Sequence, residues 1–408
     1  MANETVNYIA LAIPAFFLLI GIELLVGRLR KTPLYRFNDA VTNLNCGIGQ
    51  QVIGVFIKTL NLLLYIYIYE HYRWFDIPAT WWVWLLLFVG VDFFYYWFHR
   101  LAHEISVLWG SHVVHHQSEE YNLTVALRQA WFQSIFSSFF YLPLALIGFD
   151  PAAFVTINSF QTLYQFWIHT KAIGKLPFWF EYVFNTPSHH RVHHGVNPIY
   201  IDRNHGGTLI IFDRWFGTFQ EEREEVIFGI TSQPRSWNPL WLNIDYWATM
   251  FRNMYRADNW SDRWHIFTNT PDWKPAAWNK QATAPEAITP KNFIKYDTHL
   301  PQSLNYYILL QHLLTLTATT LFMFYYEGLP LLPRVLAASF VLLTLINVGA
   351  LLETRPWVWF AELLRLLATA VLSIVLFAAQ PTYTILAIIY TLISALWLWR
   401  EWKMTRIA

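Results

Sequence analysis

Long apolar runs alternate with short polar segments along most of this chain, and their lengths predict helices. A helix of about 20 apolar residues crosses the hydrocarbon core of a bilayer. Nine runs come near this length, at residues 7–26, 44–69, 81–98, 133–147, 154–169, 306–326, 335–352, 358–379 and 383–399. The fourth and fifth are short and flank a turn at 149–151, so they form either two full crossings or a re-entrant pair. We expect an all-α, polytopic integral membrane bundle of about nine spans.

The basic residues between the runs predict the orientation of the bundle. Lysine and arginine collect on the cytoplasmic side of membrane proteins. If the runs alternate in direction, one side receives the flanking basic residues Arg28, Arg30, Lys31, Arg36, Lys171, Lys175, Lys291, Lys295, Arg355, Arg400, Lys403 and Arg406. This pattern places the N-terminus outside and His99, after the third run, at the cytoplasmic face. The first run lacks the basic start and the cleavage site of a signal peptide, so we expect a retained span.

Residues 171–302 interrupt the apolar pattern and are expected to form a cytoplasmic helical cap. They are polar, contain many prolines and tryptophans, and include no run of spanning length. The chain therefore divides into membrane helices at 1–170, the cap at 171–302 and a four-span appendix at 303–408. The membrane is either a bacterial inner membrane or the endoplasmic reticulum.

Composition supports a membrane protein and excludes several classes of partner. Hydrophobic residues make up 55% of the chain, whereas charged residues make up 13%, about half of what soluble domains carry. A formal net charge of +1 gives no basis for nucleic-acid binding. The single cysteine, Cys46, excludes an intrachain disulfide and a thiolate-rich metal site, so nitrogen and oxygen must hold any metal.

Histidines are concentrated beside the apolar runs at helical spacing. The chain has 15 histidines, and nine lie in the two stretches 99–116 and 189–194. Positions i, i+3 and i+4 share one face of a helix, and this spacing relates His99 to His103 and recurs within the triplets His112, His115, His116 and His190, His193, His194. Eight imidazoles exceed what one ion accepts, so two ions are expected. Imidazole suits iron, zinc, copper and nickel.

Structural explanations remain for the histidines that stand alone. His71, His265, His299 and His312 are expected to be solvated or hydrogen-bonded. A single HxxxH pair also arises by chance. Three spaced motifs assigned to one membrane face would each need a separate structural explanation, whereas one metal site explains all three. A histidine-rich transporter loop is a further alternative, although such tracts usually lie in disordered segments.

The motifs HRLAH, HVVHH and HHRVHH resemble those of the fatty acid hydroxylase/sterol desaturase superfamily of membrane non-haem di-iron oxygenases. The similarity is dense from about His99 to Phe219, and stretches such as PSHHRVHHGVNPIYIDRNHGG resemble the ether-lipid-cleaving branch. The resemblance implies as iron ligands His99, His103, His112, His115, His116, His190, His193 and His194. His169, in QFWIHT, matches a further family histidine and is expected to be a ninth ligand. His205 lies where the animal enzymes are expected to carry tyrosine, and it is left out.

The resemblance also implies the reaction and its cofactors. Two Fe²⁺ ions and O₂ would hydroxylate the carbon next to the ether oxygen of an alkylglycerol-type lipid and release a fatty aldehyde. Electrons would come from an external donor, either a tetrahydropterin or a reductase and cytochrome chain, and the lipid would enter from the bilayer. Alternatives are hydroxylation or desaturation of sterols, fatty acids or other lipids and, in another class, metal transport.

Acidic residues near the motifs are candidate partners of the ligands. Ligating histidines usually donate their second N–H to a carboxylate or carbonyl. Asp92 lies seven residues before His99 inside an apolar run, where an acid is a functional hypothesis by default. Asp92 and Glu104 are therefore expected to act behind the ligands. Weaker candidates are Glu119, Glu120, Asn122 and Asp213, and Arg128 and Arg191 are expected either to bind a substrate phosphate or to pair with these acids.

Overall fold

The computed structural model describes residues 8–279, 288–289, 291–376 and 380–407. These residues form helices and two isolated bridges but no named strand. The chain divides into two compact units, Met1–Pro234 with Leu242–Tyr296, and Arg235–Trp241 with Asp297–Ala408. The expectation of an all-helical protein is confirmed for the described residues.

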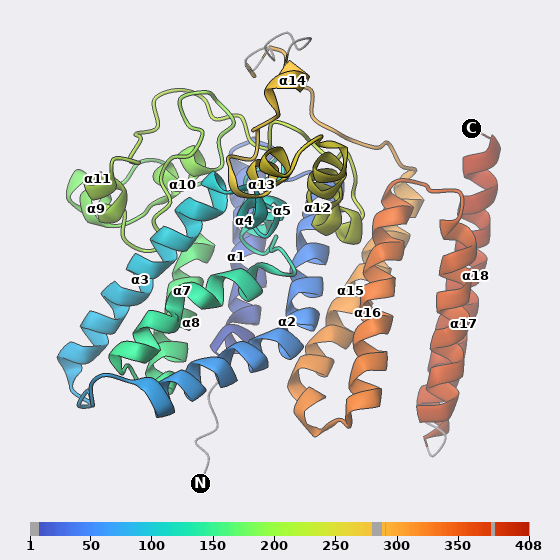
Figure 1. The fold of residues 1–408 in the computed structure, drawn as a ribbon. Coiled ribbons are helices and arrows are strands. Elements are labelled where there is room, and N and C mark those ends of the chain that lie inside the picture. Colours follow the sequence, from blue (N-terminus) through green and yellow to red (C-terminus); the bar gives the residue numbers. More distant parts are fainter. Residues whose placement is uncertain (1–7, 280–287, 290, 377–379, 408) are drawn as a thin grey trace. The chain divides into compact units, whose positions relative to one another are not determined.

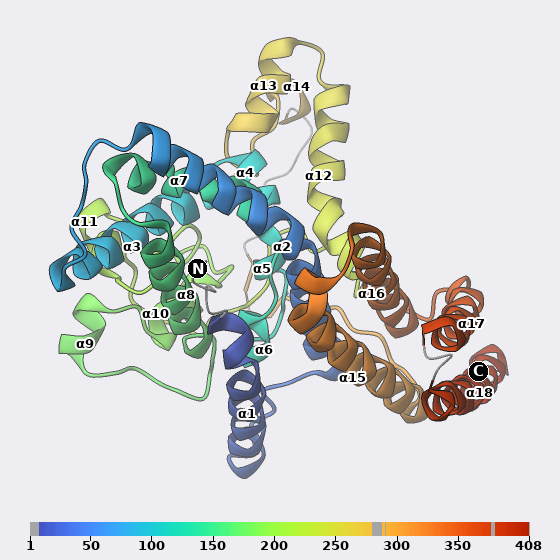
Figure 2. The same cartoon turned by 90° about the horizontal axis from the view of Figure 1, so that it is seen from below.

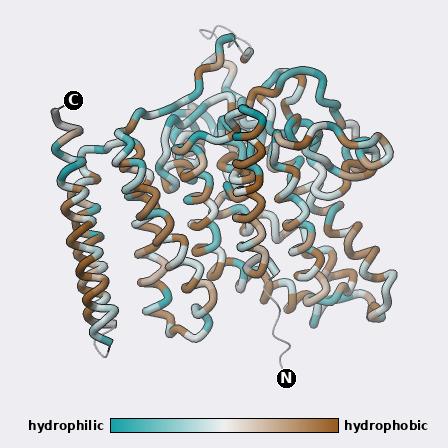
Figure 3. The backbone as a smooth tube through the Cα atoms, turned by 180° about the vertical axis from the view of Figure 1, so that it is seen from behind, coloured by the Kyte–Doolittle hydropathy of each residue, from teal (hydrophilic) through white to brown (hydrophobic). Residues whose placement is uncertain are grey.

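Six helices are long and apolar enough to cross a membrane. They are α1 (Tyr8–Leu29), α2 (Phe37–Tyr72), α3 (Trp81–Glu104), α15 (Gln302–Tyr325, continued by the 3-10 turn η1, Tyr326–Gly328), α16 (Leu331–Leu352) and α18 (Pro381–Ile407). The other three predicted runs are also helical, as α7 (Gln133–Ile147), α8 (Pro151–Trp167) and α17 (Val358–Leu376). Apolar residues follow the long helices, whereas polar residues gather in the loops (Figure 3). The structure supports a multi-pass membrane protein, and the count of nine spans stays a prediction.

In the first unit, α2, α3 and α7 enclose an apolar core. Its buried side chains include Tyr65 of α2, Leu87 of α3 and Leu144 of α7. The α7–α8 hairpin turns at Gly148, which has φ of 111° and whose Cβ, if it had one, would lie 2.0 Å from the Phe75 carbonyl oxygen. Only glycine fits this turn, because both the conformation and the space exclude a side chain.

Helix α2 begins earlier than its apolar run and changes direction along its length (Figure 1). The extra turns at its start bury polar residues, among them Asp39 and Asn43. Asp39 accepts hydrogen bonds from Asn43 (2.9 Å) and from Ser118, two residues after the second histidine motif (2.8 Å). The polar start of α2 therefore supports the histidine region.

Short helices fill the rest of the first unit. They are α4 (Ser106–Gly110), α5 (Val113–His116), α6 (Leu123–Ala126), α9 (Phe178–Val183), α10 (Pro187–His193), α11 (Ile211–Phe216), α12 (Pro239–Arg256, whose first three residues belong to the second unit), α13 (Trp260–Thr268) and α14 (Ala276–Asn279). In Figure 1, α4, α5 and α10 lie near the C-terminal end of α3. The motif helices are thus one or two turns long rather than extended amphipathic helices.

The second unit consists mainly of α15 to α18, which stand side by side (Figure 2). A polar network crosses its apolar interior. Arg365 forms a 2.6 Å ion pair with Glu362, which also accepts a hydrogen bond from Tyr307 at 2.7 Å. Because these groups satisfy one another, they join α15 to α17 without an unpaired charge.

Candidate metal centre

Four separate segments bring nine histidines into the interior of the first unit. The segments are the end of α3, helix α5 with the residue before it, the residues after α8, and helix α10 with the residue after it. Every ring is at most 7% exposed, in His99, His103, His112, His115, His116, His169, His190, His193 and His194. All nine histidines expected as ligands are therefore buried together, although the role of each as a ligand stays a prediction.

The nine rings form two groups, and within each group one nitrogen from every ring lies within 4.8 Å of the others. We name them by size. The five-histidine group contains His99, His103, His112, His116 and His193, and the four-histidine group contains His115, His169, His190 and His194. Each triplet is divided between the groups, so neither motif corresponds to one site.

In the five-histidine group, two unprotonated ring nitrogens point their lone pairs at each other. His99 Nδ1 lies 2.7 Å from the His205 carbonyl oxygen, and His112 Nδ1 lies 2.9 Å from Gln133 Oε1. Since these oxygens only accept hydrogen bonds, each Nδ1 must carry the proton and each Nε2 must be unprotonated. The two Nε2 atoms are nevertheless 3.0 Å apart. Two lone pairs at this distance repel each other unless a cation lies between them.

The four-histidine group repeats this arrangement with different acceptors. His115 Nδ1 donates to the Arg128 carbonyl oxygen (2.8 Å), and His169 Nδ1 donates to the Gln165 carbonyl oxygen (2.7 Å). The two bare Nε2 atoms lie 3.1 Å apart, and His190 Nε2 lies 3.0 Å from that of His169. Nitrogens bound at about 2.1 Å and at a right angle around one metal ion are about 3.0 Å apart.

Burial keeps these imidazoles neutral and therefore able to bind metal. It lowers the pKa of His112 and of His169 to about 3. His103, His193 and His194 each bury an Nε2 atom that has no hydrogen-bond partner among the described residues. A buried polar atom without a partner is costly. Two metal ions, one in each group, would give all three atoms a partner. The residues present therefore fit two ions held by nitrogen.

Arg128 is one of the largest fully buried side chains and contacts the protein rather than facing a lipid. Its guanidinium donates to the Val114 carbonyl oxygen (2.7 Å) and to the side-chain oxygens of Asn43 (3.0 Å) and Gln117 (3.2 Å). These bonds join α5, which carries His115, to α2. Arg128 thus positions the second motif, and the acceptors of these three hydrogen bonds are a carbonyl oxygen and two amide oxygens rather than carboxylates.

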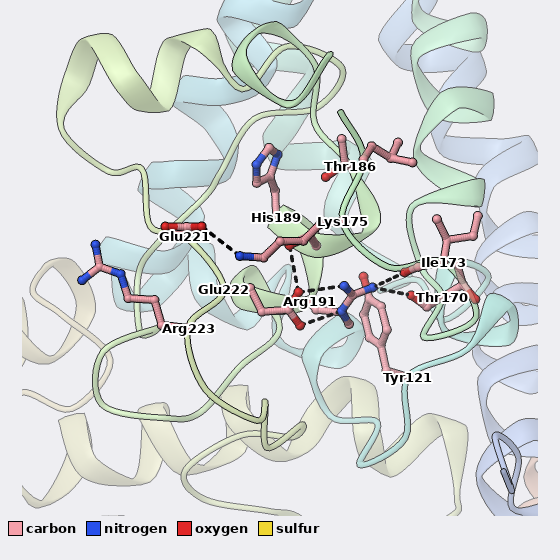
Figure 4. Close-up of polar contacts among 12 residues, drawn as sticks. Tyr121, Thr170, Ile173, Lys175, Thr186, His189, Arg191, Glu221, Glu222 and Arg223 are labelled. Atoms are coloured by element: carbon pink, nitrogen blue, oxygen red, sulfur yellow. Dashed lines mark hydrogen bonds and ion pairs between the residues drawn. The ribbon is translucent and has the colours of Figure 1, made fainter. Parts of the chain in front are cut away.

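Arg191 clamps the third motif to the chain that follows His169 (Figure 4). Its guanidinium forms a two-pronged ion pair with Glu222, at 2.8 and 2.7 Å. It also donates to the carbonyl oxygens of Thr170 (3.0 Å) and Ile173 (2.8 Å). Arg191 therefore pairs with an acid, but Glu222 is not one of the acids that the sequence suggested as its partners.

The two acids expected behind the ligands, Asp92 and Glu104, form hydrogen bonds with groups other than the histidine rings. Asp92 accepts hydrogen bonds from Gln161 Nε2 (2.6 Å) and from the backbone N–H groups of Thr208 (2.7 Å) and Leu209 (2.8 Å). Glu104 pairs with Arg100 at 2.8 Å, near the end of α3. These bonds anchor backbone and side chains rather than a histidine ring, so a catalytic role for either acid stays a prediction.

The remaining candidates anchor neighbouring segments. Glu119 and Glu120 both contact Arg36, at 3.3 and 2.6 Å, and Glu120 also contacts Lys295 at 2.7 Å. Asn122 caps α6 by accepting from the Thr124 N–H at 3.1 Å. These residues fix the chain after the second motif.

Several partners of the histidines carried no signal in the sequence. Gln133, at the start of α7, and the carbonyl groups of Gln165, Arg203 and His205 all accept from ring nitrogens. Any residue offers a backbone carbonyl, so residue identity cannot reveal these acceptors.

Comparison with known proteins agrees with the geometry. The family model described as fatty acid hydroxylase matches residues 84–218, which contain all nine histidines. Alkylglycerol monooxygenase of Xenopus tropicalis is 38% identical over 371 residues (90% of this chain, 82% of the relative), and that of Homo sapiens is 37% identical over 376 residues (90% and 82%).

A more distant relative matches about a third of the chain. Ornithine lipid hydroxylase of Rhizobium tropici is 30% identical over 135 residues, which are 32% of this chain and 40% of that protein. No solved structure gives a significant match. By its histidine region and its similarity over most of its length, the chain belongs to the fatty acid hydroxylase family, in the branch of the alkylglycerol monooxygenases.

Proposed function

We propose that this chain is a membrane-bound, O₂-dependent di-iron monooxygenase that acts on alkylglycerol ether lipids. The observation that carries the proposal is the pair of buried histidine groups with converging lone pairs. They lie in a chain that is 37–38% identical to alkylglycerol monooxygenases over 90% of its length.

The proposed reaction inserts one oxygen atom into the C–H bond next to the ether oxygen. The second oxygen atom of O₂ takes up two electrons from an external donor, together with two protons, and leaves as water. The hemiacetal that forms collapses to a fatty aldehyde and the free glycerol hydroxyl. We propose a tetrahydropterin as the donor, by resemblance, and a reductase and cytochrome chain is the other candidate.

We propose that all nine histidines ligate iron, five to one ion and four to the other. Bound iron would supply the activation of O₂ that attack on an unreactive C–H bond requires. The chain's own part is to hold each imidazole in one tautomer, as His115 and His169 are held by carbonyl oxygens. Burial of the rings excludes water, which protects a strong oxidant from side reactions.

The site is proposed to face the cytoplasm beneath the bilayer, in a bacterial inner membrane or the endoplasmic reticulum. The expected nine spans, the N-terminus outside, the cap at 171–302 and the separate four-span part at 303–408 belong to the same proposal. A cytoplasmic site next to the lipid would let the alkyl chain enter from the leaflet.

Product analysis tests the function directly. Full-length protein in lipid vesicles, with Fe²⁺, O₂ and tetrahydropterin, is expected to release a labelled aldehyde from an alkylglycerol labelled in its alkyl chain. His115→Ala and His193→Ala should abolish the product, whereas Lys31→Ala, two residues after the end of α1, should not. A wild-type enzyme that hydroxylates an ornithine lipid or a sterol and leaves the ether intact would refute the proposed substrate. Zinc alone in protein from iron-replete cells would refute the iron site.

A further inference from the structure

Four residues in the connection between α10 and α11 supply hydrogen-bond acceptors to two of the five histidines in one group and a nearby carboxylate to a third. We call residues 202–205 the 202–205 loop. The carbonyl oxygen of Arg203 accepts from His193 Nδ1 at 3.0 Å, and that of His205 accepts from His99 Nδ1 at 2.7 Å. Asp202 Oδ1 lies 3.7 Å from His103 Nδ1. The loop therefore orients rings that come from two different motifs.

The backbone of this loop has a conformation that it would not adopt without support. Asp202 and Asn204 have φ of 55° and 57°, in the left-handed region. Residues other than glycine adopt this region at a cost of about 1 kcal/mol or more, and Asn and Asp tolerate it best. The alternation of conformations turns the carbonyl groups of Arg203 and His205 toward the rings.

Asn204 supplies one part of the support. Its Nδ2 donates to the carbonyl oxygens of His189 (3.0 Å) and Gln220 (2.7 Å), and its Oδ1 accepts from the Gln220 N–H (2.8 Å). The side chain is fully buried. The amide thus joins the loop to α10 on one side and to the chain after α11 on the other.

Asp213 in α11 supplies the other part. Its carboxylate accepts from the N–H groups of His205 and Gly206, each at 2.7 Å, and from Thr218 Oγ1 at 2.6 Å. It is fully buried, so these donors replace the water it would otherwise bind. Asp213 fixes the residue whose carbonyl oxygen holds His99.

The four-histidine group has a different framework. Its rings are held by the carbonyl oxygens of Arg128 and Gln165, and the clamp between Arg191 and Glu222 joins α10 to the segment after His169. The aromatic rings found next to the His205 ring are those of His99, His103 and His193, all in the five-histidine group, and that of Tyr96.

We propose that Asn204 and Asp213 are positioning residues for the ion of the five-histidine group alone, so that this chain can lose its two ions separately. The inference rests on the proposed function, because it takes each group to bind one ion. A ligand whose ring is free to rotate binds metal more weakly, and loss of such outer partners typically costs 10- to 100-fold in affinity.

Metal content of the purified full-length protein, with Mössbauer spectra after loading with ⁵⁷Fe, provides the test. Wild-type protein is expected to hold about two irons per chain, as the proposed function requires. Asn204→Ala and Asp213→Asn are expected to hold about one, with the spectrum of an isolated ion. Asn204→Gly keeps the backbone conformation without the amide and should retain more metal than Asn204→Ala. Lys31→Ala, at another position with positive φ (56°), should retain both ions.

Double variants identify which ion is lost. In a His115→Ala background, which disables the four-histidine group, Asn204→Ala should remove the remaining iron. In a His99→Ala background, which disables the five-histidine group, adding Asn204→Ala should leave the iron content unchanged. Two irons in both Asn204→Ala and Asp213→Asn, or equal loss from both backgrounds, would overturn this inference and leave the proposed function standing. Wild-type protein that binds no metal would overturn the proposed function itself.

Discussion

Replacement of Asp92 distinguishes a structural anchor from a catalytic group. Its carboxylate accepts three hydrogen bonds, two of them from backbone N–H groups, in a fully buried position. Asp92→Ala leaves three buried donors without partners, at about 1–3 kcal/mol each before relaxation. We therefore expect a loss of about 3–5 kcal/mol in the free energy of unfolding, since part of the strain relaxes.

Asp92→Asn is the more informative change. The Asn oxygen still accepts from two of the donors, but its NH₂ group faces the third, so we expect a loss of about 1–3 kcal/mol. Asp150→Asn, at the start of α8 in the same unit, is the matched control. Asp150 caps the helix by accepting from the Ala153 N–H at 2.9 Å, and asparagine caps equally well.

Denaturant unfolding in detergent micelles measures these losses, and iron content and aldehyde yield per folded molecule are measured beside them. If Asp92 is a structural anchor, the Asp92→Asn protein should be less stable than wild type, and its folded fraction should retain both iron and turnover. Wild-type stability together with lost turnover would refute the anchoring argument and support the predicted catalytic role of Asp92.

Three further changes test other parts of the structure. Arg128→Lys should cost about 2–4 kcal/mol in thermal or denaturant unfolding, because one ammonium group cannot replace a fork that reaches three acceptors; unchanged stability would contradict this. Gly148→Ala should sharply lower the yield of folded protein, since its Cβ would meet the Phe75 carbonyl oxygen at 2.0 Å, whereas Gly174→Ala, with nothing within 4 Å, should express normally. Removal of metal by a strong chelator should lower the melting temperature, and Fe²⁺ should restore it, because ligand binding to the folded state stabilises it; a melting curve insensitive to the chelator would count against metal binding.

Much of the fold and the composition of the site followed from local patterns in the chain. Hydropathy located each long helix, but three of them extend beyond their apolar runs into polar sequence. Helix α2 begins at residue 37 rather than 44, α3 ends at 104 rather than 98, and α18 ends at 407 rather than 399. The spacing of the histidines predicted a shared site. These properties are local because helix length and helical periodicity depend on neighbours in sequence.

The partition of the histidines depended on tertiary structure. His115 joins His169 and His190 while its neighbours His112 and His116 join His99, and spacing alone treats the three as equivalent. Which ring meets which depends on the directions in which α3, α5 and α10 approach, and these are decided by packing between segments up to about a hundred residues apart.

The hydrogen-bond partners of the ligands were even harder to predict from the sequence than the two groups. Asp92 precedes His99 by two helical turns, yet its hydrogen bonds go to Gln161 of α8 and to the backbone at 208–209, partners that no local pattern in the chain indicated. The acceptors that orient the rings are mostly backbone carbonyl groups, present in every residue, and the 202–205 loop presents two of them through left-handed conformations at Asp202 and Asn204. The chain's residue types specify that imidazoles gather in a membrane protein, and only their packing specifies two separate sites.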